Sequence, residues 1–259
     1  MATNTEESII RFEGVYKAFG GPPVLAGIDF SVRRGETFAL VGPSGTGKSV
    51  TLKHMVRLLT PDEGNVYVGD IVVNRVSGRE LERVRNRFGY LFQGGALLAW
   101  MSVAGNIALP LLEKTQLTRG EIDRRVAEVL EMVGMAGDGD KKPSEISGGM
   151  KKRAGLARAI VTRPDIVLYD EPTSGLDPVT SRTIDRLIDQ LREETQITSV
   201  VVTHDLHSAL AIAHRIAVLQ DGNIIEISTP QQFVESRNEK VMRFLESQYI
   251  TKRGVWEEA

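Results

Sequence analysis

The hydrophobic positions of this chain follow two spacings, and these predict where strands and helices lie. Residues 9–40 consist of short apolar runs broken by turns, a pattern typical of short strands. The same pattern predicts a hairpin over 65–76 and another strand over 87–93. From about 96 to 162 the spacing becomes helical, and the residues from Thr118 to Glu121 match a capping box at the start of an amphipathic helix.

Beyond residue 164, apolar strands and amphipathic helices alternate. Residues 165–170 form a near-continuous apolar run, which is typical of a strand buried inside a parallel sheet. We expect a helix over 179–194, a strand over 198–203, a helix near 205–213 and then a hairpin that turns at Asp221-Gly222. This order predicts an α/β fold with a layered core. Two short helical patterns and a tail follow.

The composition narrows the class of protein. Of the 259 residues 41% are hydrophobic, which is enough for a full core. The 32 lysines and arginines nearly balance the 34 aspartates and glutamates, so we expect no nucleic acid among the partners. The absence of cysteine excludes disulfides and thiolate metal sites. No leader peptide is apparent, and the longest apolar stretches reach only about half of the ~20 residues that span a bilayer. The sequence therefore predicts a soluble protein whose membrane role comes through a partner.

One segment carries a specific chemical signal. Residues 42–49, GPSGTGKS, fit the phosphate-binding pattern G-x-x-x-x-G-K-[ST] and lie between an apolar run and residues that can start a helix. We expect Lys48 to reach the β- and γ-phosphates of a nucleotide and the Ser49 hydroxyl to bind Mg²⁺. The alternative is a glycine-rich turn. The nucleotide-binding residues predicted here are Gly42, Pro43, Ser44, Gly45, Thr46, Gly47, Lys48, Ser49 and Val50.

Two carboxylates supply what the glycine loop lacks. Hydrolysis needs a second metal-binding group and a group that acts on water. Asp170 ends an apolar strand, which places its carboxylate at the edge where open α/β sheets bind ligands. Glu171 follows and points elsewhere, so one carboxylate can bind the metal while the other accepts the proton of water. In isolation such a pair is more often a helix N-cap, but beside Lys48 the hydrolytic interpretation is favoured.

A second anion-binding turn precedes a helix-prone stretch. Ser147, Gly148 and Gly149 stand before it, and glycines with a serine at a helix N-terminus can bind an anion. The alternative is a serine N-cap behind a flexible loop. Because one ATP needs only one phosphate cradle, the second turn requires another explanation.

Six motifs in one order resemble those of the ATPase subunits of ABC (ATP-binding cassette) transporters over nearly the whole chain. They are GPSGTGKS (42–49), Gln93 after YLF, ISGGM (146–150), IVLYDEP (166–172), SGLD (174–177) and His204 in VVTHD. The resemblance implies a P-loop NTPase core with a RecA-like mixed sheet, an antiparallel β-subdomain and an inserted helical subdomain at about 96–162. It also implies one ATPase domain over 8–245, followed by a C-terminal tail over 246–259.

The resemblance further implies that two copies of the chain enclose two ATP molecules. The turn of Ser147, Gly148 and Gly149 in one copy would cap the γ-phosphate that Lys48 of the other copy holds. Glu171 would be the general base and His204 the γ-phosphate sensor. Gln93 would contact Mg²⁺ and the attacking water, and Asp177 would couple the two sites. Phe19 would stack on adenine, with Tyr16 as the less favoured candidate for this role. The alternative for Phe19 is packing within the strand.

The signature indicates a subfamily. It reads SGGMKKR in place of the commoner SGGQ and, together with FQGGALL and NIALPL, resembles the Mla/Mce phospholipid-trafficking ATPases. Met150 cannot make the hydrogen bonds of a glutamine side chain, so only the backbone of the glycines would bind phosphate. The alternatives are the ATPase of another transporter, for lipopolysaccharide, lipoprotein or a small solute, and a soluble ABC assembly ATPase.

The expected partners are a second copy, a permease, a small regulatory subunit and an Mce-type substrate-binding protein, at the cytoplasmic face of the bacterial inner membrane. Residues 94–103 place apolar side chains after a Gly-Gly hinge, as a groove for a partner's helix requires. The alternative is that Leu97, Leu98 and Trp100 pack inside the helical subdomain. Tyr249 and Trp256 are candidate anchors through which the tail contacts a partner. The alternative is that the tail is a frayed terminus.

Overall fold

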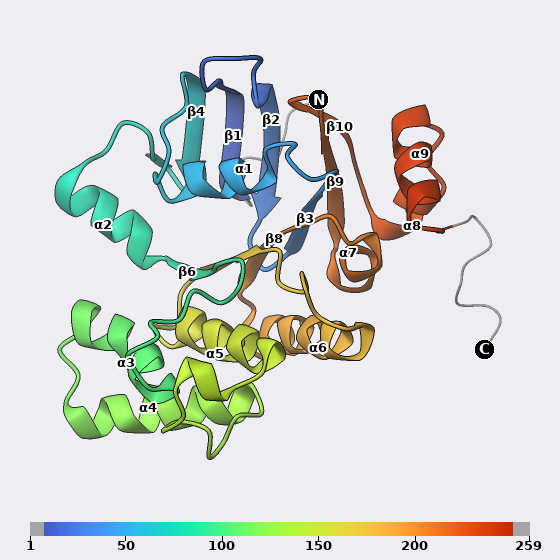
Figure 1. Ribbon diagram of the computed structural model, residues 1–259. Coiled ribbons are helices and arrows are strands. Elements are labelled where there is room, and N and C mark those ends of the chain that lie inside the picture. Colours follow the sequence, from blue (N-terminus) through green and yellow to red (C-terminus); the bar gives the residue numbers. More distant parts are fainter. Residues whose placement is uncertain (1–7, 251–259) are drawn as a thin grey trace.

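The computed structural model describes residues 8–250, which form two sheets with helices packed around them (Figure 1). The larger sheet has six strands in the order β10-β9-β3-β8-β7-β6. Neighbouring strands are parallel except in the hairpin of β9 and β10, so the predicted α/β fold with a mixed sheet is confirmed. The strands are β3 (Thr37–Val41), β6 (Phe88–Leu91), β7 (Ile166–Asp170), β8 (Thr198–Thr203), β9 (Arg215–Gln220) and β10 (Asn223–Ser228).

The three central strands β3, β7 and β8 are buried at every residue. This explains the consecutive apolar residues at 38–41, 166–169 and 200–202, because a parallel strand has helices or another sheet on both of its faces. The register pairs Val41 of β3 with Thr203 of β8, and Asp170 of β7 with Val202 of β8. The carboxyl ends of all three strands therefore meet at one edge of the sheet.

The smaller sheet is antiparallel, in the order β2-β1-β4-β5. Its strands are β1 (Ser8–Lys17), β2 (Leu25–Arg33), β4 (Glu63–Val68) and β5 (Ile71–Val72). Strands β4 and β5 are the hairpin predicted over 65–76. Stacked rings join the two sheets, since Phe30 lies with its centroid 4.5 Å from that of Phe12 and 5.4 Å from that of Phe38 on β3. Helix α1 (Lys48–Met55) follows the glycine loop.

One helix was not predicted. Helix α2 (Gly78–Asn86) buries only Val84, and its other positions are mostly charged or polar. Only Val84 and the partly buried Leu81 contact the core, and one apolar pair three positions apart is too short a period to predict a helix from the sequence.

The helices of the middle segment are α3 (Val103–Lys114), α4 (Arg119–Met132) and α5 (Gly148–Ile160). The capping box of α4 is present as predicted, with Thr118 N donating to Glu121 Oε2 at 2.7 Å. The helical stretch expected from residue 96 begins only at Val103. The chain before it has no helix because the Asn106 side chain holds it, accepting from Leu98 N at 2.7 Å and donating to the Leu98 and Ser102 carbonyls.

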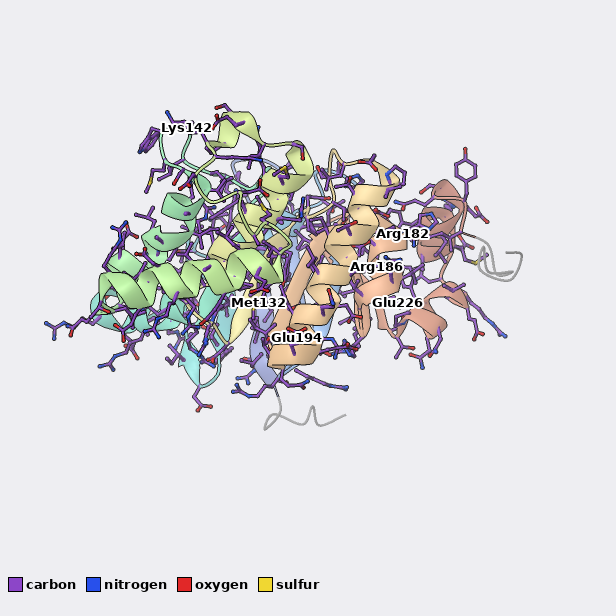
Figure 2. The ribbon with its side chains drawn as sticks, turned by 90° about the horizontal axis from the view of Figure 1, so that it is seen from below. Met132, Lys142, Arg182, Arg186, Glu194 and Glu226 are labelled. Carbon is purple, nitrogen blue, oxygen red and sulfur yellow. The ribbon has the colours of Figure 1, made fainter. Side chains whose placement is uncertain are left out.

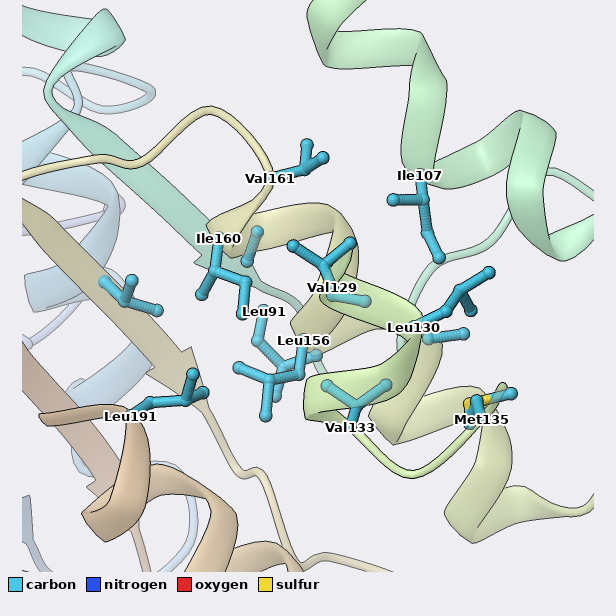
Figure 3. Packing of buried hydrophobic residues seen from close by; sticks show 14 of the residues in the cluster. Leu91, Ile107, Val129, Leu130, Val133, Met135, Leu156, Ile160, Val161 and Leu191 are labelled. Carbon is cyan, nitrogen blue, oxygen red and sulfur yellow. The ribbon is translucent and has the colours of Figure 1, made fainter. Parts of the chain in front are cut away.

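The middle helices share a hydrophobic core with helix α6 (Pro178–Thr195). Figure 3 shows part of this cluster, in which Val129 of α4 lies near Ile160 of α5, Leu130 of α4 lies near Ile107 of α3, and Leu191 of α6 approaches from the sheet side. On the outside of the same seam, Met132 of α4 and Glu194 of α6 line a shallow hollow (Figure 2). The helical segment is thus packed against the sheet layer through α5 and α6.

The C-terminal part packs on the other end of the large sheet. Helices α7 (Leu206–Ile212), α8 (Pro230–Val234) and α9 (Glu239–Ser247) contribute to a separate core cluster that includes Val41 and Ile250. The two short helical patterns predicted near the end of the chain are α8 and α9. Trp256 lies outside the described residues. Within residues 8–250, no helix combines the length and apolar character needed to cross a membrane.

Candidate nucleotide site

The glycine loop runs from β3 to α1 as the sequence predicts, and two of its glycines have no room for a side chain. A Cβ on Gly42 would lie 2.2 Å from the carbonyl oxygen of Leu219, and one on Gly47 would lie 2.7 Å from Val24 Cγ1. Gly47 also has φ +100° and is the N-cap of α1. Because glycine carries no capping side chain, the first N–H groups of α1 face the loop and can bind phosphate.

Lys48 is folded back into the loop. Its Nζ donates to the carbonyl oxygens of Gly42 at 2.8 Å and Pro43 at 3.0 Å, and lies 3.8 Å from Glu171 Oε1. Only 5% of the residue is exposed, and burial lowers the pKa of the Lys48 ammonium. A buried ammonium held mainly by neutral carbonyls gains from a phosphate that adds negative charge, so the loop fits a nucleotide.

Asp170 and Ser49, the two residues of the loop and strand expected at Mg²⁺, lie in contact. Ser49 Oγ donates to Asp170 Oδ1 at 2.7 Å, and Tyr90 Oη donates to Asp170 Oδ2 at 3.4 Å. One hydroxyl and one carboxylate suit a hard cation such as Mg²⁺, which keeps several waters and takes few protein ligands. Ser49 Oγ and Asp170 Oδ1 are therefore the protein oxygens that could hold Mg²⁺ at this loop.

Glu171 is held on every side. It has φ +50°, a left-handed conformation that is uncommon for a non-glycine residue. Its N–H donates to Val202 O at 2.9 Å, and its carbonyl accepts from Lys152 Nζ at 2.7 Å. Its Oε2 lies 2.8 Å from Nδ1 of His204. The strained backbone is therefore fixed by neighbours from two other segments, as expected where geometry serves function.

Within residues 8–250, Gln93, Phe19 and Asp177 make no hydrogen bond or ion pair with Lys48, Asp170 or Glu171. Gln93 follows β6 and is exposed. Phe19 is 57% exposed, with Lys17 Nζ 5.3 Å from the ring centroid, so it is not strand packing, while Tyr16 is half-buried in β1. Asp177 is the N-cap of α6 and accepts from the backbone N–H groups of Val179 and Thr180 at 3.0 Å each.

The signature turn stands at the start of α5. Ser147 caps this helix by accepting from Met150 N, and Gly149 packs so closely on Thr180 that a Cβ there would lie 2.5 Å from Thr180 Cγ2. Ser147 and Gly148 are exposed. In the part of the chain that the structure describes, no hydrogen bond or ion pair joins Ser147, Gly148 or Gly149 to the glycine loop.

Residues 94–103 fit both predicted roles, since some side chains pack inside the helical segment and others are exposed for a partner. Leu97 packs against the core of the helical segment, whereas Trp100 is 75% exposed. Phe92, just before the segment, is 38% exposed and stacks on Tyr90 with ring centroids 4.0 Å apart. The segment is therefore anchored at Leu97 and presents Trp100 outward.

The sequence did not reveal several supporting residues: Tyr90, Lys152, Thr203 and Gln248. Lys152 and Tyr90 lie next to recognisable motifs but carry no signal of their own. A lysine in an amphipathic helix and a tyrosine in a strand are ordinary there, and only the tertiary fold brings them to Asp170 and Glu171.

A buried lysine inside a glycine loop, beside carboxylates that end a parallel strand, is how nucleotide hydrolases hold a triphosphate. The fold and the site define the class: a P-loop nucleoside triphosphatase. Comparison with known proteins gives the family. The model of the family described as ABC transporter matches residues 25–174, and the chain belongs to this family. It is the ATP-hydrolysing subunit of an ABC transporter.

Its relatives carry different transport descriptions. A probable ribonucleotide transport ATP-binding protein, mkl of Mycobacterium leprae, is 39% identical over 96% of this chain and 72% of its own length. The intermembrane phospholipid transport system ATP-binding protein MlaF of Haemophilus influenzae is 37% identical over 93% of this chain and 92% of its own. A solved dimeric bacterial ABC transporter cassette superposes with a TM-score of 0.80 at 33% identity, covering 85% of this chain and 98% of that one.

Proposed function

We propose that this chain drives a phospholipid transporter of the Mla/Mce type, from the cytoplasmic face of the bacterial inner membrane. The observation that carries the proposal is the signature SGGMKKR, in which Met150 is half-buried and packs against the core of the helical segment. The similarity to MlaF supports the proposal, because the alignment covers 92% of MlaF but only 72% of mkl.

The proposed working unit is a dimer of two copies around two ATP molecules. The exposed turn at Ser147 and Gly148 and the glycine loop make no contact within one chain, so each would be completed by the other copy. The likeness to a dimeric cassette supports this arrangement. Asp177 caps α6, against which the signature glycine Gly149 packs, and we assign it the coupling of the two sites.

In the proposed reaction each residue has one role. Lys48 binds the β- and γ-phosphates, and Phe19 stacks on the adenine ring. Glu171 accepts the proton of the attacking water through a carboxylate oxygen, and His204, 2.8 Å from that carboxylate, contacts the γ-phosphate. Ser49, Asp170 and Gln93 would hold Mg²⁺, which neutralises charge on the phosphates when bound.

The proposed membrane contact lies at residues 94–103. Trp100 is exposed beside the anchored Leu97, and exposed aromatic side chains are typical anchors of protein interfaces. A permease helix is the occupant we assign. A small regulatory subunit and an Mce-type protein complete the proposed assembly, without nucleic acid.

Two substitutions test the site. Lys48→Ala is expected to abolish ATP hydrolysis by the purified chain in Mg-ATP, whereas Lys53→Ala, an exposed lysine of the same helix, leaves it unchanged. Glu171→Gln is expected to bind ATP, stop hydrolysing it and elute as a dimer in size-exclusion chromatography. Normal turnover of Lys48→Ala would overturn the site, and a monomeric Glu171→Gln in Mg-ATP would overturn the dimer.

The substrate is tested by purifying the tagged chain with its partners from detergent-solubilised membranes and identifying bound lipids by mass spectrometry. We expect an integral membrane protein and enriched phospholipid. The second candidate is a small-solute transporter, which the mkl relative's description as a ribonucleotide transport protein favours. A complex without phospholipid would support it, and a chain that stays soluble without any membrane partner would support an assembly ATPase.

A further inference from the structure

A glutamine at the C-terminal end of the described chain holds the backbone of the His204 segment. The Gln248 side chain donates through Nε2 to the carbonyl oxygen of His204 and accepts through Oε1 from Leu206 N at 2.8 Å. The Gln248 carbonyl oxygen lies 3.3 Å from His207 Nε2. We name this set of three contacts the Gln248 clasp. It joins residues more than forty positions apart in the sequence.

The clasp supplies what the local sequence leaves unpaired. Asp205 is the N-cap of α7, and its carboxylate accepts from the second and third N–H groups of the helix, those of His207 and Ser208. The first N–H, that of Leu206, has no acceptor there and is bound by Gln248. The His204 carbonyl precedes this helix and needs a donor in the same way.

His204 is thus held from two sides. On one side its backbone N–H and its Nδ1 lie 3.4 Å and 2.8 Å from Glu171 Oε2. On the other side its carbonyl accepts from Gln248. Because its side chain is 50% exposed, packing alone does not fix the imidazole, and the orientation of its backbone decides where the ring lies.

The clasp is itself firmly anchored. Helix α9 ends in a Schellman motif, in which Ile250 N donates to Leu245 O and Tyr249 N donates to Glu246 O. Leu245 and Ile250, on either side of Gln248, are buried in one cluster with Leu206. This motif places Gln248 at the C-cap of α9, so the helix position and the His204 backbone are linked through one side chain.

We infer that Gln248 is a positioning residue of the ATPase, which keeps His204 at the carboxylate of Glu171 and at the γ-phosphate. The inference rests on the proposed role of His204. Without the clasp, the peptide between His204 and Asp205 can turn, and the imidazole leaves its place for part of the time. Binding of ATP through the glycine loop does not depend on that peptide.

The test compares steady-state ATP hydrolysis by the full chain and its variants in Mg-ATP, with melting temperatures measured in parallel. Gln248→Ala is expected to lower kcat about three- to tenfold, the factor that corresponds to one lost hydrogen bond, with KM for ATP unchanged. Gln248→Glu keeps an acceptor for Leu206 N but loses the donor to His204, so it is expected to keep α7 capped and still lower kcat. The matched control is Tyr249→Gly, which removes an exposed ring at φ +58°, a conformation open to glycine.

The same substitution is then made in a His204→Ala chain, where a residue that acts through His204 has nothing left to position. There Gln248→Ala is expected to lower the residual rate by less than about 1.5-fold. An equal loss in both backgrounds, or a lowered melting temperature with unchanged kcat, would show a purely structural residue and overturn the inference. If His204→Ala hydrolyses ATP at the wild-type rate, both the proposed role of His204 and the inference about Gln248 are wrong. If His204→Ala loses turnover but Gln248→Ala does not, only the inference about Gln248 is wrong.

Discussion

Replacing Lys152 by methionine tests how the backbone of Glu171, the proposed general base, is held. Lys152 lies on α5 with 3% of its surface exposed, and its Nζ donates to the Glu171 carbonyl at 2.7 Å. Methionine fills nearly the same volume without a charge or a donor. The substitution therefore removes this one hydrogen bond while the helix packing is kept.

The expected loss of stability follows from two opposing effects. A hydrogen bond from a charged donor stabilises the fold by about 1.5–3 kcal/mol, and its removal leaves the buried carbonyl of Glu171 without this partner. Against this, the buried ammonium is costly to desolvate, as shown by its lowered pKa, and methionine relieves that cost. We expect a net loss of about 1–2 kcal/mol, which lowers the melting temperature by roughly 2–8 °C in a chain of this size.

The effect on hydrolysis is expected to be larger than the effect on stability. Glu171 has φ +50°, and a freed carbonyl lets the peptide relax toward a less strained conformation that moves the carboxylate. Since a displacement of about 1 Å at a reacting group costs on the order of a hundredfold, kcat is expected to fall at least about tenfold. Steady-state ATPase assays and thermal melts measure both effects.

The matched control is Lys151→Met, which removes the same charge from the neighbouring position of α5. It is expected to leave kcat within twofold of the wild type. A Lys152→Met chain that melts several degrees lower but hydrolyses ATP at the normal rate would refute the reasoning, because Lys152 would then only stabilise the fold.

Two further substitutions test the loop and a buried acid. Gly42→Ala is expected to abolish binding of a fluorescent ATP analogue and to lower the melting temperature more than Gly45→Ala. A Cβ at Gly42 would lie 2.2 Å from the Leu219 carbonyl oxygen, whereas at Gly45 nothing lies within 4 Å and the cost is only that of its φ of +83°. Asp185, which accepts a hydrogen bond from Ser208 Oγ, has its pKa raised to about 6 by burial. The folded chain therefore binds the proton more tightly than the unfolded chain does, and stability falls as the pH rises from about 4 to 6. At 1.36 kcal/mol per pKa unit, Asp185→Asn is expected to be more stable than the wild type at pH 7 by about 1–3 kcal/mol. Thermal unfolding measured at pH 7 and pH 5 is expected to show a smaller difference in stability at pH 5.

The sequence predicted the layered α/β fold because its strongest signals are local. Consecutive apolar residues at 38–41, 166–169 and 200–202 mark buried parallel strands, and the structure has strands there. Helix α2 was missed because only Leu81 and Val84 form its apolar face, which is too short a period to mark a helix. The helical segment was predicted to begin too early because the Asn106 side chain holds the preceding residues as coil. Period-based prediction cannot detect a single tertiary hydrogen bond.

The sequence also predicted the residues of the site that belong to local motifs and missed those that come from distant segments. Lys48 and Ser49 belong to a contiguous motif, and their spacing alone predicts the phosphate loop. The groups that hold Glu171 and His204 in place come from elsewhere: Lys152 is 19 positions away from Glu171, and Gln248 is 44 positions away from His204. A supporting residue of this kind needs only a donor or an acceptor at one point in space, so many residue types in many segments could serve, and no sequence pattern marks it.

Lys152 also gives the proposed dimer a physical route between its two sites. Helix α5 begins at Gly148, capped by Ser147, and Lys152 follows about one helical turn later, a distance of about 6 Å along the axis. In the proposed dimer Ser147 meets the nucleotide of the other copy, while Lys152 holds the carbonyl of Glu171 in its own copy. One turn of hydrogen-bonded helix cannot bend appreciably over that length, so a shift of the signature turn must move either Lys152 or Glu171. In the proposed dimer, contact with ATP in one site would therefore be coupled to the position of Glu171 in the other.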